Sequence, residues 1–424
     1  MLDLEFIRRN IDLVKKAIQD KGDKVDMDKV LELDKQRRRI ITNLDKLRNE
    51  RRKSSEEIAV LKKNKQDADT LIQKMKLASD EITKLEEEER NIEKSFSEAL
   101  SWIPNIPAKD VPVGRGAEDN IEVRHWGERK AFDFTPLPHW EIGQKLGILQ
   151  SEIAGRITGS GFILLSGMGA RLERALINFM IDLHTKKHGF REILPPYLVN
   201  RQSMFSTGQL PKLEGDMYHT SDEDLFLIPT AEVPLTNMWR EQIIQEEKLP
   251  LYYVGATPCF RREAGSYGKD TRGIVRVHQF NTVELVKFVH PDTSFDELEK
   301  LLQCAESVLK ALELEYRVVK LCTTEMSFAS AKTYDIEAWA PGLGRYLEVS
   351  SCGNFTDFQA RRGNIRFKGK DGKTKFVHTL NGSGVALPRT LICLLETHQQ
   401  KDGSILIPKV LQPYMDGLER ISVE

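Results

Sequence analysis

The feature that most constrains the fold is the stretch 30–100, which contains neither glycine nor proline. Apolar residues recur along it at alternating steps of three and four, as in the seam of a coiled coil. A polar segment, KNKQDADT at 63–70, lies between two such frames. We therefore expect two long helices that fold back as an antiparallel hairpin, each of about 35 residues and roughly 50 Å long. The first frame comprises Val30, Leu33, Ile40, Leu44, Leu47, Ile58 and Leu61, and the second comprises Leu71, Met75, Ala78, Ile82, Leu85, Ile92 and Phe96.

The charge of this hairpin is unevenly distributed. Residues 35–65 hold twelve Lys or Arg and four Asp or Glu, whereas residues 66–98 hold five and ten. The two helices could pair these charges with each other, as a solvated coiled coil does. Alternatively, the hairpin is a projecting arm whose basic face binds a phosphate backbone. Both interpretations stay open at this level. The candidate phosphate-binding residues are Arg37, Arg38, Arg39, Arg48, Arg51 and Arg52.

Composition excludes several classes of protein. The 424 residues carry a formal net charge of -1, which gives no global sign of a nucleic-acid partner. None of the five cysteines has CxxC spacing, so neither a zinc site nor a disulfide framework is indicated. The N-terminus lacks the apolar core of a signal peptide, and no apolar run reaches about 18 residues. We expect a cytoplasmic protein with no membrane partner.

The rest of the chain has a mixed pattern. Proline and glycine cluster in SWIPNIPAKDVPVGRGAEDN, which predicts a linker. Short β-rich segments follow, and only one helix clearly separates successive strands, so a mostly antiparallel sheet flanked by helices is favoured over regular βαβ winding. The predicted class is α+β, with a helical domain at 1–105, whose arm spans about 30–100, a linker at 106–135 and a mixed domain at 136–424. No GxGxxG motif follows a predicted strand, so a Rossmann nucleotide site is not indicated. GKDGKT at 369–374 resembles the end of a P-loop, but Phe367 occupies the position of that motif's first glycine.

The stretch FRREAGSYGKDTRGIVRVHQF, at 260–280, carries charges suited to a nucleotide. Arg261 and Glu263 share a face at the end of one predicted strand. Arginine forks suit phosphate oxygens, and an aromatic ring can stack on a base. A hairpin with surface salt bridges is the alternative. The returning strand is expected to present Arg276, His278, Phe280, Thr282 and Glu284 on one face, while Gly265, Gly268 and Gly273 suit a loop that moves onto a substrate.

This stretch resembles motif 2 of the class II aminoacyl-tRNA synthetases, and within them the seryl-tRNA synthetase family. FLIPTAEVPLTN resembles the family's serine-binding loop, EVSSCGNFTDFQARR its metal and ATP strand, and LNGSGVALPRTLICLLE its motif 3. The helix ending in REILPPYLV resembles motif 1, which forms the dimer, and the N-terminal hairpin resembles the tRNA-binding arm. The resemblance covers essentially the whole chain.

The resemblance implies a role for each matching residue. Arg261 would hold the ATP α-phosphate and the serine carboxylate, and Phe280 and Arg389 would enclose the adenine. Glu348 and Ser351 would hold Mg²⁺ on the phosphates. The implied catalytic residues are Arg261, Glu348 and Arg389. The implied ATP-binding residues are Arg261, Arg262, Glu263, Val277, Phe280, Glu348, Val349, Ser350, Ser351 and Arg389; the implied serine-binding residues are Thr230, Ala231, Glu232, Arg261, Glu284, Asn381 and Ser383.

The implied activity is that of a homodimeric serine–tRNA ligase, which would activate L-serine with ATP and charge tRNA(Ser), and which leaves tRNA(Sec) open as a second substrate. Three departures from the family pattern are Arg262, Gly353 and Pro388, none of which replaces a residue that carries a side-chain role.

Other class II synthetases usually append an anticodon-binding domain after motif 3, but only 35 residues follow Arg389. A paralogue that loads a carrier protein would lack the arm. The remaining alternative is a catalytically inactive synthetase-like coiled-coil interaction protein, which the intact motif residues disfavour.

Overall fold

The structure is a computed structural model, and it describes residues 1–264 and 272–422. The chain divides into two compact units, one made of Met1–Gly22 with Pro104–Glu424 and the other of Asp23–Ile103. Two short helices, α1 (Leu4–Arg9) and α2 (Ile11–Asp20), belong to the larger unit. None of the helices in the described ranges is long and apolar enough to cross a membrane.

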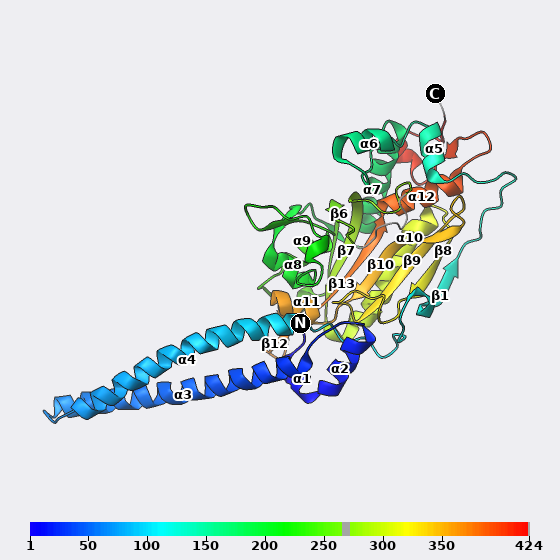
Figure 1. Cartoon of the computed structure of the whole chain (residues 1–424). Helices are drawn as coiled ribbons and strands as arrows, with labels where there is room; N and C mark the ends of the chain where they lie inside the picture. The colour runs from blue at the N-terminus through cyan, green and yellow to red at the C-terminus, as the bar shows by residue number, and fades with distance from the viewer. Residues whose placement is uncertain (265–271, 423–424) are drawn as a thin grey trace. The chain divides into compact units, whose positions relative to one another are not determined.

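The smaller unit is the predicted helical hairpin (Figure 1). Helix α3 (Met27–Lys63) begins at Asp26, whose carboxylate accepts a hydrogen bond from the Lys29 backbone at 2.9 Å. Helix α4 (Asp69–Ser101) runs back beside α3 after a short polar turn. The seam is built as the periodicity predicts. Its buried centre is Ile40, Leu44 and Ile82, with Leu47, Leu85 and Ile92 packed around it.

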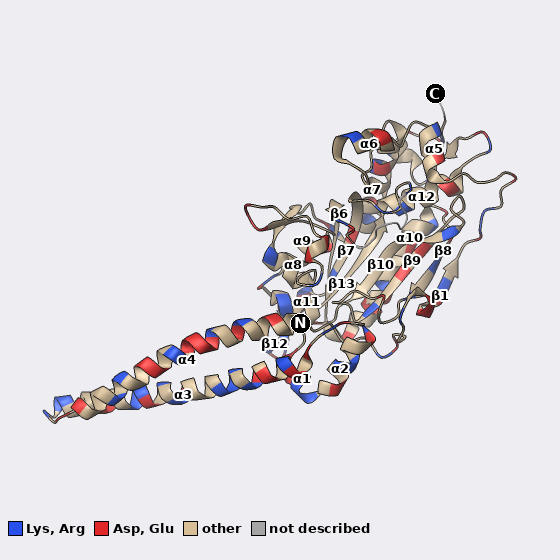
Figure 2. Cartoon of the chain, in the orientation of Figure 1, with Lys and Arg blue, Asp and Glu red and all other residues tan. Residues whose placement is uncertain are grey.

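Basic and acidic residues are interspersed along both helices of the hairpin (Figure 2), and ion pairs join the two helices. Arg48 on α3 pairs with Glu86 on α4 at 2.8 Å, and Arg37 pairs with Glu93. Two of the six candidate phosphate-binding arginines therefore serve the helix pair itself. Arg39, Arg51 and Arg52 are exposed. Pairing between the helices therefore accounts for part of the charge asymmetry, and phosphate binding by the exposed arginines stays a prediction.

The larger unit is built on an eight-stranded sheet in the order β1-β8-β9-β10-β13-β7-β6-β2. Every neighbouring pair is antiparallel except β2 and β6. This confirms the predicted α+β class with a mostly antiparallel sheet. The strands are β1 (Ile121–Trp126), β2 (Arg191–Glu192), β6 (Leu251–Phe260), β7 (Gln279–Val289), β8 (Tyr316–Lys320), β9 (Lys332–Ala340), β10 (Arg345–Asn354) and β13 (His378–Ala386).

Alternation along the strands separates the two faces of this sheet. On β7, Val283 and Leu285 enter the largest apolar core, whereas Thr282 and Glu284 line a cavity on the opposite face. Three helices cover the core side: α7 (Met168–Lys187), α10 (Ser294–Ala311) and α12 (Leu387–His398). On the face opposite these helices, β7 contributes Thr282 and Glu284 to the cavity, and Val286 and Phe288 to a second apolar core.

The apolar face of α7 packs within the same chain. Leu172, Leu176, Phe179 and Met180 form the apolar face of this helix, which leads into the REILPPYLV segment. All four are buried in the core formed with the sheet, α10 and α12. Packing within one chain therefore accounts for this helix face without a second subunit, because strands β6 and β7 contact the helix.

Candidate active site

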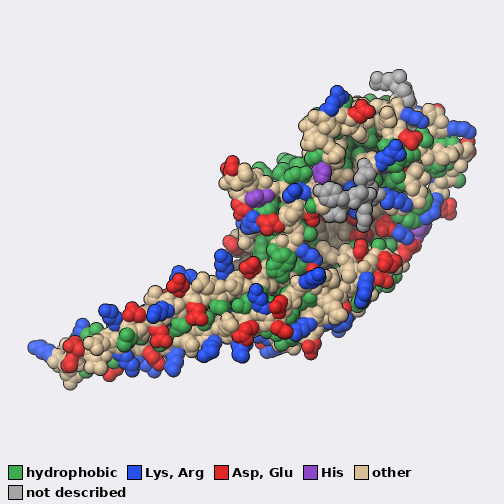
Figure 3. Space-filling view, viewed as in Figure 1, with side chains coloured by type: hydrophobic (Ala, Val, Ile, Leu, Met, Phe, Trp, Pro, Cys, Tyr) green, Lys and Arg blue, Asp and Glu red, His purple; other side chains and the backbone are tan. Residues whose placement is uncertain are grey.

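A cavity of about 680 Å³ lies on the face of the sheet that carries Thr282 and Glu284. Its floor comes from β7, β9, β10 and β13, and its walls come from the segments before α9 (Glu232–Asn237), after β6 and at the start of α12. Acidic and basic side chains gather around a hollow on the face of the larger unit shown in Figure 3. The pairing of β13 with β7 brings together residues that are 89 to 104 positions apart in the chain.

Most of the residues implied by the resemblance line this one cavity. They are Thr230, Glu232, Arg261, Glu263, Val277, Phe280, Glu284, Glu348, Ser351, Asn381, Ser383 and Arg389. Four others, Ala231, Arg262, Val349 and Ser350, are outside its lining: Arg262 is exposed beside it, and the other three are buried. The arm arginines belong to the smaller unit.

The β6–β7 hairpin positions Arg261 at the edge of the cavity. The two strands are in register from Leu251 to Phe260, so Arg261 follows the last paired residue. Its Nε donates to the Pro229 carbonyl at 3.2 Å, and its guanidinium lies 5.1 Å from the centre of the Phe280 ring. The rest of the guanidinium is exposed toward the cavity, as phosphate recognition requires.

The predicted strand face is shorter than expected. Strand β7 begins only at Gln279, so the alternation does not extend back to His278. That ring instead lies 3.0 Å from the Arg261 carbonyl and against Phe162, and it is absent from the cavity lining. Arg276 does line the cavity, through an irregular backbone, and pairs with Glu263 at 3.2 Å. Gly265 and Gly268, expected in a moving loop, are outside the described residues.

Two buried carboxylates, Glu232 and Glu284, stand at one end of the cavity. Glu284 accepts hydrogen bonds from Asn381 at 2.7 Å and from Ser383 at 3.3 Å. Burial, followed by the negative charge of Glu232, raises the pKa of Glu284 to about 8. Burial likewise raises the pKa of Glu232 to about 7, against hydrogen bonding from Gln359 and the charge of Arg261. Such a pair in a cleft is typical of a site that receives a cation.

Strand β10 and helix α12 form the other end. Arg389, in the first turn of α12, donates to the Glu348 carboxylate at 2.8 Å and to the Glu348 carbonyl at 2.9 Å. Its Nε also reaches the Val275 carbonyl, at 3.3 Å. Phe280 and Arg389 therefore present a ring and a planar cation in the same cavity, as stacking of a nucleobase requires.

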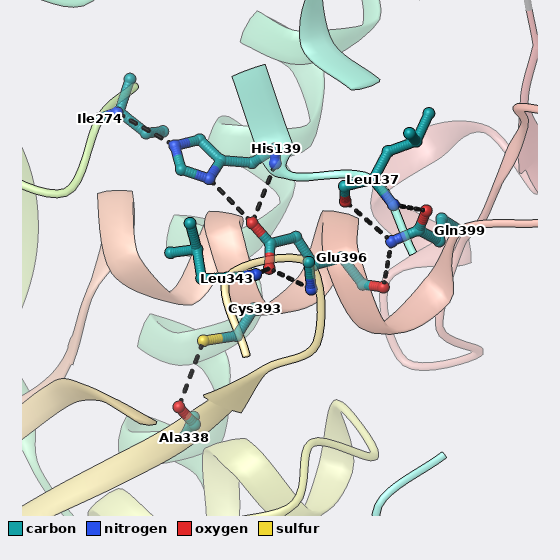
Figure 4. A network of polar contacts seen from close by, with 9 residues as sticks. Leu137, His139, Ile274, Ala338, Leu343, Cys393, Glu396 and Gln399 are labelled. Carbon is teal, nitrogen blue, oxygen red and sulfur yellow. Dashed lines mark hydrogen bonds and ion pairs between the residues drawn. The ribbon is translucent and has the colours of Figure 1, made fainter. Parts of the chain in front are cut away.

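The segment that leads from the 260–280 stretch into β7, at Gly273 and Ile274, is held by a buried hydrogen-bond network that no sequence pattern indicates (Figure 4). This segment is called the loop exit below. His139 donates through its backbone and through Nδ1 to one oxygen of Glu396, each at 2.9 Å. Its other ring nitrogen accepts from the Ile274 backbone at 3.2 Å. Gly273 has φ of 74°, and a Cβ there would lie 2.0 Å from this ring. Helix α12 therefore fixes the loop exit through His139 as well as through Arg389.

Comparison with known proteins agrees with this geometry. Residues 214–398 match the model of the tRNA synthetase class II core domain (G, H, P, S and T), and residues 1–107 match that of the seryl-tRNA synthetase N-terminal domain. The fold and the site thus define a class II aminoacyl-tRNA synthetase.

Full-length relatives narrow the class to one family. The chain is 56% identical over 416 residues to the serine–tRNA ligase of Caldanaerobacter subterraneus subsp. tengcongensis, covering 98% of both chains. It is 55% identical over 419 residues to that of Thermodesulfovibrio yellowstonii, covering 98% of this chain and 99% of the other. The crystal structure of seryl-tRNA synthetase from Pyrococcus horikoshii complexed with ATP superposes with a TM-score of 0.92 at 38% identity, covering 100% of both chains. The chain belongs to the seryl-tRNA synthetase family, which confirms the family that the motifs predicted.

Proposed function

We propose that this cavity activates serine with ATP and that the chain then transfers serine to tRNA(Ser). The observation that carries the proposal is the pair of buried carboxylates, Glu232 and Glu284, in the same cavity as the exposed guanidinium of Arg261. This arrangement complements an amino acid, because carboxylates attract its ammonium group and the arginine attracts its carboxylate. The ring of Phe280 and the guanidinium of Arg389 then accommodate the adenine.

The reaction has two steps. A serine carboxylate oxygen attacks the α-phosphorus of ATP, which forms seryl-adenylate and releases pyrophosphate. A hydroxyl of the terminal tRNA ribose next attacks the acyl carbon, which forms the ester and releases AMP. Arg261 stabilises the charge that develops on the α-phosphate, and no side-chain nucleophile is needed because in-line phosphoryl transfer depends on positioning and electrostatics.

Serine would be selected by its hydroxyl. Asn381 and Ser383 already donate to Glu284, and alanine would leave the remaining hydrogen-bonding capacity of these polar groups unused. A site built to hydrogen-bond a hydroxyl can reject the analogue that lacks it by about 10⁴-fold or more. Threonine is excluded by bulk.

The residues present fit a magnesium ion bound together with ATP. Glu348 and Ser351 lie on β10. Asp335 pairs with Ser351 from β9, and its buried carboxylate oxygen Oδ1 has no hydrogen-bond partner among the described residues. Oxygen ligands of this kind suit Mg²⁺, which is usually held by one or two protein groups plus substrate phosphates. Bound there, Mg²⁺ would neutralise phosphate charge, with Glu348 and Ser351 as its protein ligands.

The proposal is tested by ATP–pyrophosphate exchange with each amino acid in turn. We expect exchange that depends on serine and on Mg²⁺, with alanine and threonine giving far lower kcat/KM. Exchange driven best by another amino acid would assign the cavity to a different synthetase activity. Absence of exchange from a folded protein would favour the inactive interaction protein. We confine the expected tRNA to tRNA(Ser), because no feature of the described arm favours tRNA(Sec).

We also propose that the chain forms a two-fold dimer through the segment around Pro195 and Pro196. Although the α7 face is buried, this segment exposes apolar side chains: Leu194 is 80% exposed, Leu198 46% and Tyr197 37%. It follows β2, which is the edge strand of the main sheet. An edge that carries exposed apolar residues is suited to pairing with another chain.

The dimer predicts that Leu194→Asp shifts the mass measured by light scattering from two chains to one at micromolar concentration. A buried unpaired charge at the centre of an interface weakens association strongly. Leu77→Asp is the matched control, because Leu77 is 70% exposed on the helical hairpin. A wild-type protein that is monomeric at this concentration, or a Leu194→Asp variant that stays dimeric, would contradict this interface.

A further inference from the structure

Gln359 contacts the proposed serine-binding site from behind. It lies on α11 (Phe358–Gly363), is 1% exposed and does not line the cavity. Its Nε2 donates to Oε1 of Glu232 at 2.6 Å and to the Thr207 carbonyl at 3.0 Å. Its Oε1 accepts from the Thr379 hydroxyl at 2.7 Å. All the polar atoms of this buried amide are thus engaged.

These partners fix which way the amide points. The two groups on the nitrogen side, the Glu232 carboxylate and the Thr207 carbonyl, have only acceptor oxygens when Glu232 is ionised. A flipped amide would place its oxygen against both of them. The Thr379 hydroxyl, itself 1% exposed, supplies the donor that the amide oxygen needs. Residue 359 therefore offers Glu232 a permanent donor, and Thr379 keeps it in place.

We propose that Gln359 is a positioning residue for serine binding, which holds Glu232 through one carboxylate oxygen so that the other remains a charged acceptor for the substrate ammonium. This inference rests on the proposed function. Glu232 is the group through which Gln359 acts, since Gln359 itself touches no part of the cavity. Gln359 is not among the serine-binding residues that the family motifs imply.

The electrostatics of the site explain why Glu232 needs the hydrogen bond from Gln359 to stay charged. Three groups face Glu232 from neighbouring elements: Arg261 after β6, Glu284 on β7 and Gln359 on α11. Burial disfavours a charged Glu232, whereas the Gln359 amide and Arg261 favour it. Because the pKa of Glu232 is already raised to about 7, loss of the amide donor would move it further upward. Serine would then bind well only at higher pH.

A purely structural role for Gln359 is the competing explanation. The residue also links the end of α8 (Arg201–Thr207) to β13, so its removal will lower stability in either case. The two roles differ in what they do to ionisation. Loss of packing alone weakens serine and ATP binding together and leaves the pH at which serine binding is lost unchanged.

The experiment measures serine-dependent pyrophosphate exchange from about pH 6 to 9 for the full chain and for Gln359→Met, which removes the donor at similar volume. We expect the KM for serine to rise about ten- to a hundredfold, as for the removal of a hydrogen bond to a charged group. The KM for ATP should stay within about twofold. The acidic limb of kcat/KM for serine should move to higher pH, since Glu232 then ionises later.

Two further variants keep the test decisive. Gln399→Met is the matched control, because Gln399 is another buried glutamine, 3% exposed, that bonds to the Leu137 backbone away from Glu232. It should lower stability without shifting the acidic limb. If Gln359→Met does not fold, Thr379→Val removes only the hydroxyl that orients the amide, and it should shift the limb in the same direction by less.

An acidic limb that stays at the wild-type pH in Gln359→Met, or in Thr379→Val where only that variant folds, would overturn the inference. So would a parallel rise of the KM values for serine and ATP. Failure of the proposed function has a different signature: the wild-type protein itself would show no serine-dependent exchange at any pH.

Discussion

Replacing Arg261 with alanine is expected to lower the rate of serine-dependent pyrophosphate exchange by about a hundredfold or more. The guanidinium stands exposed at the cavity, 5.1 Å from the centre of the Phe280 ring. A charge-assisted contact that strengthens as the α-phosphate gains charge is worth a few kcal/mol in the transition state. Removing it acts on kcat as well as on KM.

The same substitution should leave folding nearly intact. Arg261 is exposed, and its Nε bonds to one backbone carbonyl, that of Pro229. Thermal unfolding would verify that the variant is folded before its rate is interpreted. Arg156→Ala is a suitable control, since Arg156 is an exposed arginine on α6 (Ser151–Thr158) and does not line the cavity. Near-normal exchange by folded Arg261→Ala would remove this residue from the proposed mechanism.

Local periodicity explains why the hairpin could be predicted from the sequence. Helices α3 and α4 each bury one stripe, and residues that recur every three or four positions mark that stripe in any single helix. The buried centre at Ile40, Leu44 and Ile82 is the predicted seam. The sheet was predictable only as a class, because its order joins strands from distant parts of the chain, such as β1 with β8.

Local sequence patterns could not predict contacts that depend on long-range packing. The apolar stripe of α7 is the same in sequence whether it meets a second subunit or its own sheet. Strands β6 and β7 lie beneath it, so Leu172 and Met180 are core residues. Similarly, alternation placed His278 on the strand face, but the chain enters β7 one residue later, at Gln279.

The supporting groups of the site were the least predictable. Gln359 and Glu232 are 127 positions apart, and His139 and Glu396 are 257 apart. Neither pair has a periodicity or a spacing that links its members. The resemblance to the family found groups that line the cavity, such as Glu232 and Arg389, because they lie in the motifs. Residues that act through these groups can be identified only from the folded structure. There, Gln359 on α11 contacts Glu232 on α9, and Glu396 on α12 contacts His139 at the loop exit.

Deleting residues 30–100, with a short linker joining the chain ends, is expected to separate the two chemical steps. The hairpin contains none of the residues that line the cavity, so serine-dependent pyrophosphate exchange should continue at close to the rate of the intact protein. Charging of tRNA(Ser) should fall severely, because the arginines proposed to bind its phosphates are removed with the arm. The two assays, run on one preparation, distinguish loss of tRNA binding from loss of folding.

Substitutions in the full-length chain give the same test without a deletion. Arg39, Arg51 and Arg52 are exposed cations on α3, whereas Arg48 is paired with Glu86 and would also lower hairpin stability if changed. The triple alanine variant of those three should raise the KM for tRNA and leave the KM for serine unchanged. Its salt dependence should flatten, by a slope of about 0.7 to 0.9 in log K against log salt for each phosphate that the variant no longer neutralises.

The matched control removes three exposed cations from the other helix of the hairpin, Lys74, Lys76 and Lys84 on α4. If tRNA follows the basic helix, this control should affect charging less than the α3 variant does, although both remove the same charge. Equal effects would mean that net charge alone attracts the tRNA. If the protein without the arm charges tRNA(Ser) at the rate of the full-length protein, the exposed arginines of α3 only form the solvent-facing surface of the coiled coil. The hairpin would then serve some partner other than tRNA.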